Sequence, residues 1–190
     1  MILRAAAAAF ARTGYAATSM EDIAAAAGIT RLIVYRHFPG KEALYRAVLQ
    51  SAFNRFAAAL QGAPEPGGYG VGARALLAVA RADEDGFRLL WRHACREARF
   101  ARYADALRRQ VVAAARTALA DRVPPESLEW AAHAVVGYLV EAVLNWLEFG
   151  DPSRDEQLAA ATNHALRAGV RAWGDSPSGK AQRRNRGATG

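Results

Sequence analysis

The sequence predicts an all-α protein, and three observations support this. Alanine, the best helix former, is frequent along the chain, and apolar residues recur at the 3.6-residue spacing of amphipathic helices. No strong alternation of β-branched and polar residues, the pattern of a half-buried strand, interrupts them. With 190 residues, of which 52% are hydrophobic, the chain is long enough for one medium domain or for a small domain followed by a larger one.

The first two predicted helices are short. Apolar residues share one face from Ile2 to Gly14, and this glycine is a plausible C-terminal stop for a helix of about a dozen residues. Ser19 then opens a second helix as its N-cap, with Asp22 three residues later in the position of a capping box. Gly28 ends this second helix. The N-terminal segment therefore begins with two helices that lie close together in the sequence.

A third short helix and a long one follow. We expect Thr30 to cap a helix that runs to about His37, where Pro39 and Gly40 break the chain. Beyond them, residues 41–60 keep the apolar spacing of a helix over about 30 Å. This long helix joins a small three-helix domain to the rest of the chain.

A stretch rich in Gly and Pro over residues 62–72 is the clearest break in the sequence. The predicted helices after this break lie near residues 71–82, 86–99, 102–122, 125–149 and 154–173. From residue 175 onward, Ser, Gly, Pro and Arg occur without apolar periodicity. We therefore predict a small three-helix domain over 1–48, a larger all-helical domain over 49–174, and a disordered basic tail over 175–190.

The positive charge is concentrated toward the N-terminal end. Residues 1–60 carry seven Arg or Lys against three acidic residues, a net charge of +4, whereas residues 61–173 are balanced and residues 174–190 carry +3. A basic folded block indicates an anionic partner that touches that block. Nucleic acid is the leading candidate for this partner.

Targeting and redox signals are few. We find no secretory leader pattern and no uncharged run of about 18 apolar residues, so we expect neither secretion nor a membrane span. The single cysteine, Cys95, excludes an intrachain disulfide and a multi-cysteine metal cluster, and we expect it to be a small buried residue. These features favour the cytoplasm as the compartment of the protein.

The second and third predicted helices have the layout of a helix-turn-helix. They meet at Ala27-Gly28-Ile29, where a glycine permits a sharp turn, and they lie in the basic block. Arg31 at the start of the third helix can donate two hydrogen bonds to guanine. Leu32 and Ile33 either contact thymine methyl groups or pack inward against the first helix, and the sequence leaves both readings open. Lys41 is a natural phosphate ligand, with a solvated lysine as the alternative.

The first quarter of the chain carries a dense set of family-typical residues. These are Phe10, Gly14-Tyr15, Thr18-Ser19, Asp22-Ile23-Ala24, Ala27-Gly28-Ile29, Tyr35, His37-Phe38 and Lys41-Glu42. With this spacing, residues 2–49 resemble the DNA-binding domain of the TetR family of transcriptional regulators. Many members have small or hydroxylated residues where Leu32 and Ile33 stand, so the base preference of this chain does not follow from the resemblance.

The resemblance implies a dimeric all-α regulator whose third helix enters the major groove of double-stranded DNA. Together with the spacing, it gives nine DNA-binding candidates: Ser19, Thr30, Arg31, Leu32, Ile33, Tyr35, Arg36, His37 and Lys41. We expect a repressor that binds a palindromic operator as a homodimer and is released by a small-molecule effector. The alternative is a helical small-molecule-binding protein or enzyme that does not act on DNA.

The resemblance implies a helix-turn-helix DNA-binding domain over 1–48 and a ligand-binding and dimerisation domain over 49–174. Two further sets of residues are assigned to this second domain. Polar and aromatic groups on otherwise apolar helices often face a ligand cavity, and on this basis the ligand-binding candidates are Trp91, His93, Arg96, Tyr103, Tyr138, Glu141 and Asn145. Apolar and small residues of the last two helices are the candidates for a homodimer interface built as a four-helix bundle: Val136, Val140, Leu144, Leu147, Leu158, Ala161, Ala165 and Gly169. A monomer with a thick core is the alternative to this dimer.

Catalytic and metal-binding patterns are weak in this sequence. His93 and Cys95 are two residues apart on a predicted helix, so they face different sides and cannot form a nucleophile and base pair with each other. The four histidines show no paired spacing typical of a metal site. We therefore expect no catalytic residues, no metal and no cofactor, with an unidentified small molecule as the effector.

Overall fold

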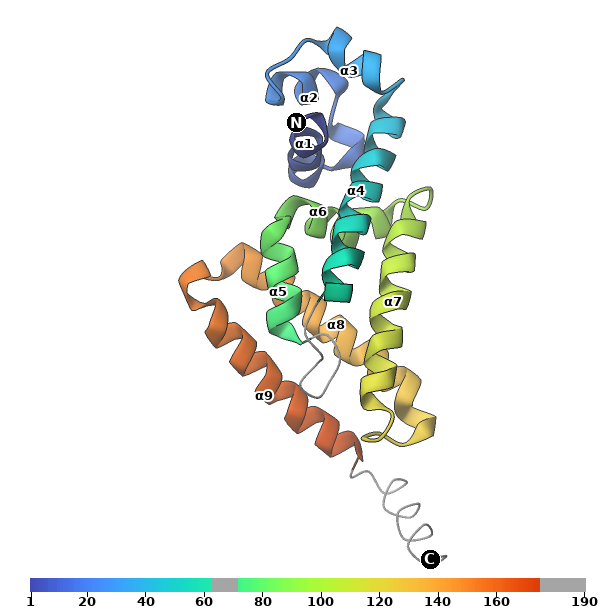
Figure 1. The fold of residues 1–190 in the computed structure, drawn as a ribbon, viewed down its shortest axis with the longest axis vertical. Coiled ribbons are helices and arrows are strands. Elements are labelled where there is room, and N and C mark those ends of the chain that lie inside the picture. Colours follow the sequence, from blue (N-terminus) through green and yellow to red (C-terminus); the bar gives the residue numbers. More distant parts are fainter. Residues whose placement is uncertain (63–71, 175–190) are drawn as a thin grey trace, which may run out of the picture. The chain divides into compact units, whose positions relative to one another are not determined.

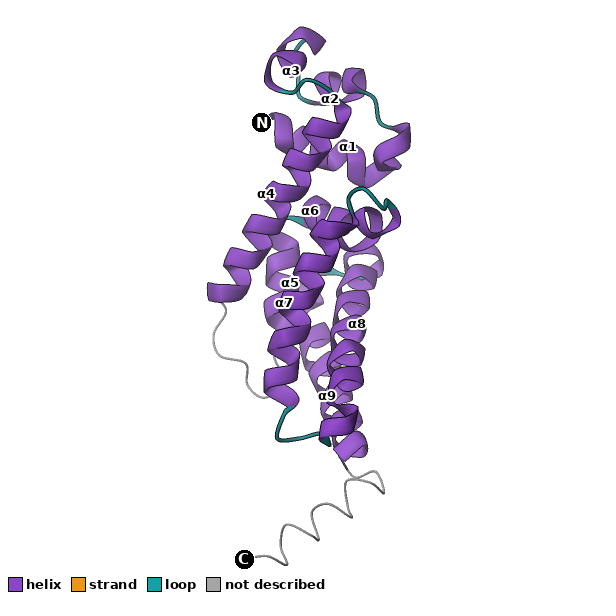
Figure 2. Ribbon diagram, turned by 90° about the vertical axis from the view of Figure 1, so that its right-hand side faces the viewer, coloured by secondary structure: helices purple, strands orange, loops and turns teal. Residues whose placement is uncertain are grey.

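The computed structural model describes residues 1–62 and 72–174, and every regular element in these two ranges is a helix (Figure 2). The elements are α1 (Ile2–Ala17), α2 (Met20–Ala26), α3 (Arg31–His37), α4 (Lys41–Gly62), α5 (Ala73–Ala82), α6 (Glu84–Arg88), the π-helix η1 (Leu89–His93), the 3₁₀-helix η2 (Ala94–Arg96), α7 (Ala101–Leu119), α8 (Pro125–Phe149), the 3₁₀-helix η3 (Pro152–Arg154) and α9 (Asp155–Gly174). The all-α prediction is confirmed. Residues 63–71 of the break predicted over 62–72, and the predicted tail over 175–190, lie outside the described residues.

The chain divides into two compact units. Of the described residues, the N-terminal unit contains 1–62 and 79–107, and the C-terminal unit contains 72–78 and 108–174. In Figure 1, which is coloured from blue at the N-terminus to red at the C-terminus, the first unit includes helices α1 to α4 and helix α6. The division into these two units does not coincide with the domain boundary after residue 48 that the sequence indicated, and that boundary stays a prediction.

Helix α1 is bent by a glycine. It buries a run of small residues and Phe10 against the rest of the N-terminal unit. Gly14 has φ +82°, a conformation that L side chains rarely adopt, and the backbone is non-helical there. The chain then resumes helical geometry up to Ala17, so the glycine kinks α1 and does not end it as the sequence predicted.

Four aromatic rings form the centre of the N-terminal unit. Tyr45 of α4 contacts Phe10 at 4.7 Å between ring centroids, Tyr15 at 4.9 Å and Phe100 at 4.6 Å. The Tyr45 side chain is completely buried, and its hydroxyl has no hydrogen-bond partner among residues 1–62 and 72–174. Burial raises the pKa of this phenol strongly, so it stays neutral. The cluster fixes α1 and α4 against the segment that precedes α7.

The segment between α6 and α7 is irregular. The sequence predicted one helix over residues 86–99, whereas the structure has α6, then η1 and η2 in succession. The prediction of a continuous α-helix was therefore wrong. The wider π-helical turn coincides with burial of three consecutive side chains, Leu89, Leu90 and Trp91, which one face of an α-helix does not present together. Both α6 and η1 pack against α1 and α4 within this unit.

Helices α8 and α9 pack together in the C-terminal unit. Trp146 Nε1 donates a hydrogen bond of 2.6 Å to Asp155 Oδ1, which ties the end of α8 to the start of α9. Arg74 of α5 forms an ion pair with Glu156 at the same end of α9. These contacts connect the consecutive helices α8 and α9 with α5, which is distant from them in the sequence.

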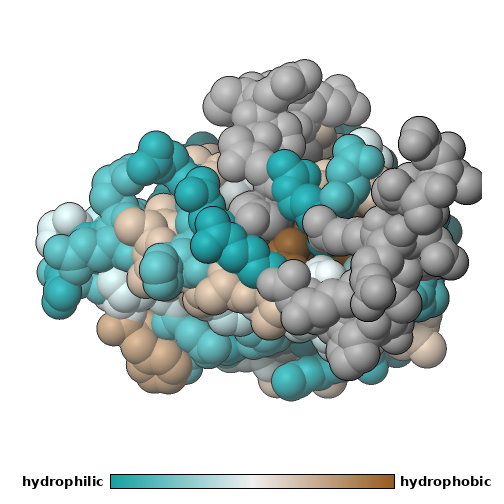
Figure 3. Space-filling model, turned by 90° about the horizontal axis from the view of Figure 1, so that it is seen from below, coloured by the Kyte–Doolittle hydropathy of each residue, from teal (hydrophilic) through white to brown (hydrophobic). Residues whose placement is uncertain are grey.

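By length and composition alone, α8 could cross a membrane. Eight of its side chains are nevertheless buried in the fold, among them Val135, Leu139 and Val143. A helix buried on more than one side needs this apolar composition in water as well. The face of the molecule drawn in Figure 3 is mainly hydrophilic over the residues described, with only small hydrophobic areas.

Candidate nucleic-acid interface

A capping box starts α2. Ser19 Oγ accepts a hydrogen bond of 3.0 Å from the Asp22 backbone N–H, and Asp22 Oδ2 accepts one of 2.9 Å from the Ser19 backbone N–H. The Ser19 hydroxyl, which donates a hydrogen bond of 2.7 Å to Asp22 Oδ2, and the Ser19 backbone N–H hold the pKa of the Asp22 carboxyl below its usual value. The capping pair predicted from the sequence is therefore present, and it fixes where α2 begins.

A glycine turn joins α2 to α3. Gly28 has φ +65°, which a residue with a side chain adopts only with strain. The turn is closed by backbone hydrogen bonds from Gly28 to Ala25 at 3.1 Å and from Ile29 to Ala24 at 3.0 Å. Because these bonds are local, the angle between the two helices is fixed by residues close together in the sequence.

Buried apolar side chains lock the two short helices together. Ile23 and Val34 are completely buried, and the small Ala24 is nearly so. Ala27 and Ile29 of the turn are half-buried. Since α3 buries only Val34 among its seven residues, its remaining side chains are available to a partner.

The outward face of α3 combines apolar and basic groups. Leu32 is 79% exposed, so it does not pack inward, and Ile33 and Tyr35 are exposed as well. Arg36 and His37 are exposed in the last turn of the same helix. Large apolar side chains exposed next to cations are unfavourable in water, and they match the thymine methyl groups and phosphates of a duplex.

An open hollow lies beside this face. It measures about 470 Å³ and is lined by Met1, Ile2, Leu3, Ile29, Ile33, His37 and Phe38. Ile33 therefore borders both the solvent and this hollow. Its position is intermediate between the two interpretations from the sequence, contact with DNA and packing against the first helix. The hollow is lined by residues from the start of α1 and from the end of α3, so these two helix ends lie close together.

Arg31, the first residue of α3, has two partners. It forms an ion pair with Glu21 of α2, and its Nη2 donates a hydrogen bond of 3.3 Å to the Tyr35 hydroxyl. The guanidinium carbon also lies 5.0 Å from the centroid of the Tyr35 ring. These contacts hold an otherwise flexible cation on the exposed side of α3.

Lys41 lies at the start of α4 and is not simply solvated. Its Nζ donates a hydrogen bond of 3.1 Å to the Ala16 carbonyl and lies 4.7 Å from the centroid of the Tyr15 ring. The Arg99 guanidinium contacts the same ring at 5.1 Å. A cation is thus held where α4 begins, close to the end of α1.

The remaining DNA-binding candidates have simple environments. Thr30 occupies the N-cap position of α3 with extended backbone, but its side chain makes no capping hydrogen bond. Ser19 is half-buried and hydrogen-bonded to Asp22. All nine candidates belong to the N-terminal unit. Glu21 was not among the candidates, because an acidic residue gives no DNA-binding signal in a sequence.

The ligand-binding candidates are divided between the two units, and their role stays a prediction. Trp91 and Tyr103 are buried in the N-terminal unit, where His93 is half-buried and Arg96 is exposed. Burial lowers the pKa of His93, as do the charges of Arg96 and Arg92. The other three candidates, Tyr138, Glu141 and Asn145, are exposed on α8 in the C-terminal unit.

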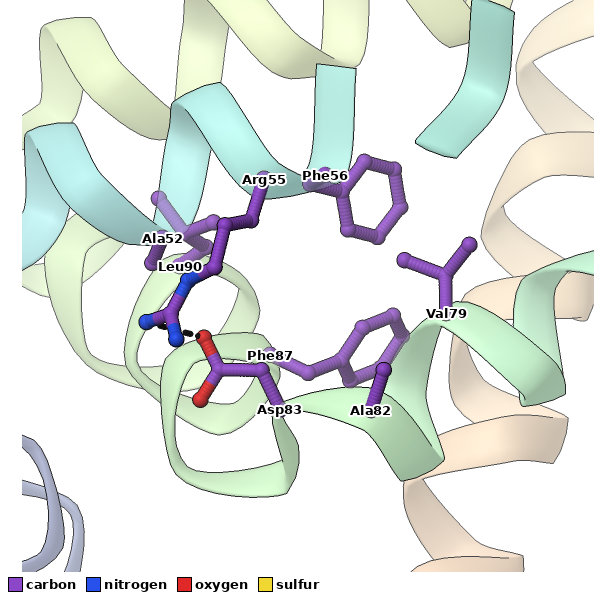
Figure 4. Close-up of a pocket in the computed structure, with 8 residues that line it drawn as sticks. All are labelled: Ala52, Arg55, Phe56, Val79, Ala82, Asp83, Phe87 and Leu90. Carbon is purple, nitrogen blue, oxygen red and sulfur yellow. Dashed lines mark ion pairs between the residues drawn. The ribbon is translucent and has the colours of Figure 1, made fainter. Parts of the chain in front are cut away.

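A small cavity in the N-terminal unit was missed by the sequence reading (Figure 4). Its volume is about 60 Å³, and its lining is Ala52, Arg55, Phe56, Val79, Ala82, Asp83, Phe87 and Leu90. Arg55 Nη2 and Asp83 Oδ2 form an ion pair of 2.7 Å, drawn dashed in Figure 4. Pockets for small-molecule ligands usually measure about 300–1,000 Å³, so this cavity has room for little more than water.

The dimer candidates are split between core and surface. Val136, Val140 and Leu144 are buried within their own chain, whereas Ala161 and Ala165 are exposed. Leu147, Leu158 and Gly169 are half-buried. The large apolar side chains that α8 exposes are not among these candidates: Trp130 is 58% exposed, Tyr138 44% and Phe149 79%.

The cysteine is not buried as expected. Cys95 is exposed in the irregular segment before α7, and its thiol lies 3.4 Å from the Trp91 carbonyl oxygen as a hydrogen-bond donor. Among residues 1–62 and 72–174, no cluster of three or more His, Cys, Asp or Glu side chains is arranged to hold a metal ion.

Residues 2–48 match the family described as bacterial regulatory proteins, tetR family. A TetR-like transcriptional regulator from Rhodococcus sp. RHA1 is similar in structure, with a TM-score of 0.69, 23% identity, and coverage of 87% of this chain and 93% of that one. A tetR-family transcriptional regulator from Streptomyces coelicolor has a TM-score of 0.60 and 26% identity, with coverage of 96% of this chain and 93% of that one. A transcriptional regulator of the TerR/AcrR family from Aquifex aeolicus has a TM-score of 0.67 and 16% identity, with coverage of 88% of this chain and 96% of that one. A search of curated proteins finds no significant match.

Proposed function

Since its N-terminal domain and its all-helical fold are those of the TetR family of transcriptional regulators, we propose that this chain is a ligand-responsive repressor. In this proposal it binds a palindromic operator as a homodimer, and a small-molecule effector releases it. The observation that carries the proposal is the exposed face of α3, where Arg31, Leu32 and Tyr35 stand outside the core of the unit.

The chemistry of α3 supports binding in the major groove. An α-helix fits this groove, where guanine offers two acceptors to an arginine and thymine offers a methyl group to an apolar side chain. Arg31 and Leu32 provide these two kinds of group at the N-terminal end of the helix. Lys41 provides a cation and His37 a ring N–H for phosphates.

The C-terminal unit supports a homodimer. Helix α8 exposes Trp130, Tyr138 and Phe149, and its charged residues are all acidic: Glu126, Glu129, Glu141 and Glu148. On α9, exposed small residues such as Ala161 and Ala165 lie near Arg167 and Arg171. The carboxylates and bulky groups of α8 are complementary to the small groups and the two arginines in the second half of α9, so α8 of one copy suits α9 of the other.

Two such subunits would present two copies of α3 to one face of DNA. Half-sites about one helical turn apart, at about 34–36 Å, are then expected. The effector would act by favouring a different spacing of the two copies, and a preference of about 1–3 kcal/mol suffices for roughly 5- to 150-fold weaker operator binding. The effector site would have to open further than the cavity in Figure 4.

Selection of bound fragments from random-sequence DNA, followed by salt titration, tests the proposal. The wild-type protein is expected to prefer the selected duplex over a scrambled duplex of equal length and composition. Arg31→Ala should cost about 1–3 kcal/mol at one base pair, whereas Lys41→Ala should weaken all duplexes alike and reduce the salt slope by about one.

A protein that retains both duplexes equally would contradict the proposal. It would favour the alternative, a helical ligand-binding protein or enzyme that does not act on DNA. Equal losses on every duplex for both variants would contradict the division between base contact and phosphate contact.

A further inference from the structure

Glu21 carries a negative charge on the surface that we assign to DNA. It lies in the first turn of α2, and its side chain is more than half exposed, as is that of its partner Arg31. A carboxylate that faces phosphates opposes binding. A carboxylate in the first turn of a helix stabilises that helix, but this would explain an acidic residue at Glu21 without any partner. The ion pair with Arg31 therefore calls for a separate explanation.

The ion pair determines which donors of Arg31 remain available. Nη1 contacts Glu21, and Nη2 contacts the Tyr35 hydroxyl one helical turn further along α3. The aromatic ring supports the guanidinium from the side at 5.0 Å. Each terminal nitrogen has a second N–H, so the held guanidinium keeps donors for another acceptor.

Phosphate and guanine make different demands on such a group. A phosphate attracts positive charge and is present at every sequence, and the carboxylate of Glu21 already neutralises the charge of Arg31. Guanine offers O6 and N7 in a fixed geometry, which a guanidinium held in one orientation meets with a smaller loss of side-chain entropy. A neutralised and oriented arginine therefore loses more of its attraction to phosphate than to guanine.

We infer that Glu21 is a positioning residue that sets the sequence specificity of Arg31. This inference rests on the DNA-binding function proposed above. With Glu21 in place, Arg31 is kept from neighbouring phosphates and held toward a base edge. Without it, Arg31 becomes a mobile cation that binds the backbone of any duplex.

Binding of full-length Glu21→Gln to the selected and the scrambled duplex, measured by fluorescence anisotropy over a series of salt concentrations, tests this inference. Glutamine keeps the size of the side chain and removes its charge. The affinity for the scrambled duplex should rise by about 3- to 10-fold, with a salt slope steeper by about one per subunit. The affinity for the selected duplex should change less, so the specificity ratio should fall.

Two further variants separate this role from a simple change of charge. Glu42→Gln removes the same charge from a carboxylate that pairs with Arg46 and Arg99 and not with Arg31, and it should leave the specificity ratio unchanged. In an Arg31→Ala background, Glu21→Gln should also leave the ratio unchanged, because its effect passes through the arginine.

The results distinguish the inference from the function on which it rests. Equal gains of Glu21→Gln on both duplexes, or the same fall in ratio when Arg31 is absent, would overturn the positioning role and leave the repressor proposal intact. A wild-type protein without preference for the selected duplex would overturn the repressor proposal itself, and with it this inference.

Discussion

Helices α3 and α8 both expose large apolar side chains, but in opposite electrostatic settings. On α3, Leu32 and Ile33 stand beside Arg31, Arg36 and His37. On α8, all charged side chains other than histidine are acidic. Apolar surface beside cations suits a polyanion with methyl groups in its grooves, whereas apolar surface beside carboxylates repels DNA and suits another protein.

The two helices also differ in how they are held. Helix α3 has seven residues and buries one, so its position depends on the turn and on α2. Helix α8 has 25 residues and buries eight, so it is part of the core of its own unit. A short helix that buries little can offer almost all its side chains to a partner, whereas a long core helix offers only the stripe that its own fold leaves uncovered.

The largest effect is expected on the α8 side. Tyr138→Glu adds a fifth carboxylate to a helix that already repels anions, and each dimer would carry it twice. We expect dissociation into monomers and a loss of operator affinity of about 100-fold or more, because the two reading helices are no longer linked. Analytical ultracentrifugation and operator titration measure the two effects.

Gln110→Glu is the matched control for this variant. It adds the same charge at an exposed position of α7 in the same unit, and it should change neither property. A Tyr138→Glu protein that stays dimeric with unchanged affinity would show that this face of α8 is not the interface.

The next effect is expected at the apolar tip of α3. Leu32→Ala removes most of an exposed apolar side chain, which costs little in the free protein. If Leu32 is buried against a thymine methyl group, operator binding should weaken by about 1–2 kcal/mol, roughly 5- to 30-fold. Titration against operators with each base pair replaced should place the loss at one position. A loss spread evenly over all positions would assign Leu32 to general packing.

A smaller effect is expected on stability from the capping box. Ser19→Ala removes the N-cap hydroxyl of α2, and we expect a loss of about 1 kcal/mol in the free energy of unfolding at neutral pH. Because folding lowers the pKa of Asp22 below its usual 3.8, its stabilising contribution is present above that value and is lost as the pH falls through the folded pKa.

Urea unfolding followed by circular dichroism at pH 7 and below pH 4 measures this dependence. The wild-type protein and Ser19→Ala should differ less in the acidic series than at pH 7. A difference that stays constant over this range would show that the Asp22 carboxylate does not act with Ser19.

The smallest effect is expected in the aromatic core of the N-terminal unit. Tyr45→Phe removes a buried hydroxyl that has no partner, so stability should stay the same or rise by up to about 1 kcal/mol. Tyr103→Phe is the contrast, because the Tyr103 hydroxyl accepts a hydrogen bond of 3.1 Å from Arg102. Thermal unfolding should rank Tyr45→Phe above Tyr103→Phe, and the reverse order would show that the Tyr45 hydroxyl has a stabilising partner.

Some features of the interface are local in origin and could be predicted from the sequence. Ser19 and Asp22 are three residues apart, and Gly28 occupies a turn that only a glycine adopts without strain. Each depends on the backbone of its own segment. For this reason the capping box and the glycine turn of the helix-turn-helix could be predicted before the structure was known.

Other features depend on how the helices pack. Apolar spacing indicated that Val136, Val140 and Leu144 would be buried, but not whether a neighbouring helix or a second subunit would cover them. The ion pair between Glu21 and Arg31 joins residues on two helices, so it exists only because the turn brings these helices together.

By itself, the sequence determined the helical class, the helix-turn-helix and the basic character of its surface, because helix propensity, capping and net charge act within a few residues of each position. Only the tertiary structure decided that Leu32 faces solvent, that the segment before α7 is irregular, and that Glu21 holds Arg31. These depend on which surfaces meet, and a one-dimensional pattern gives the face of a helix without its neighbour.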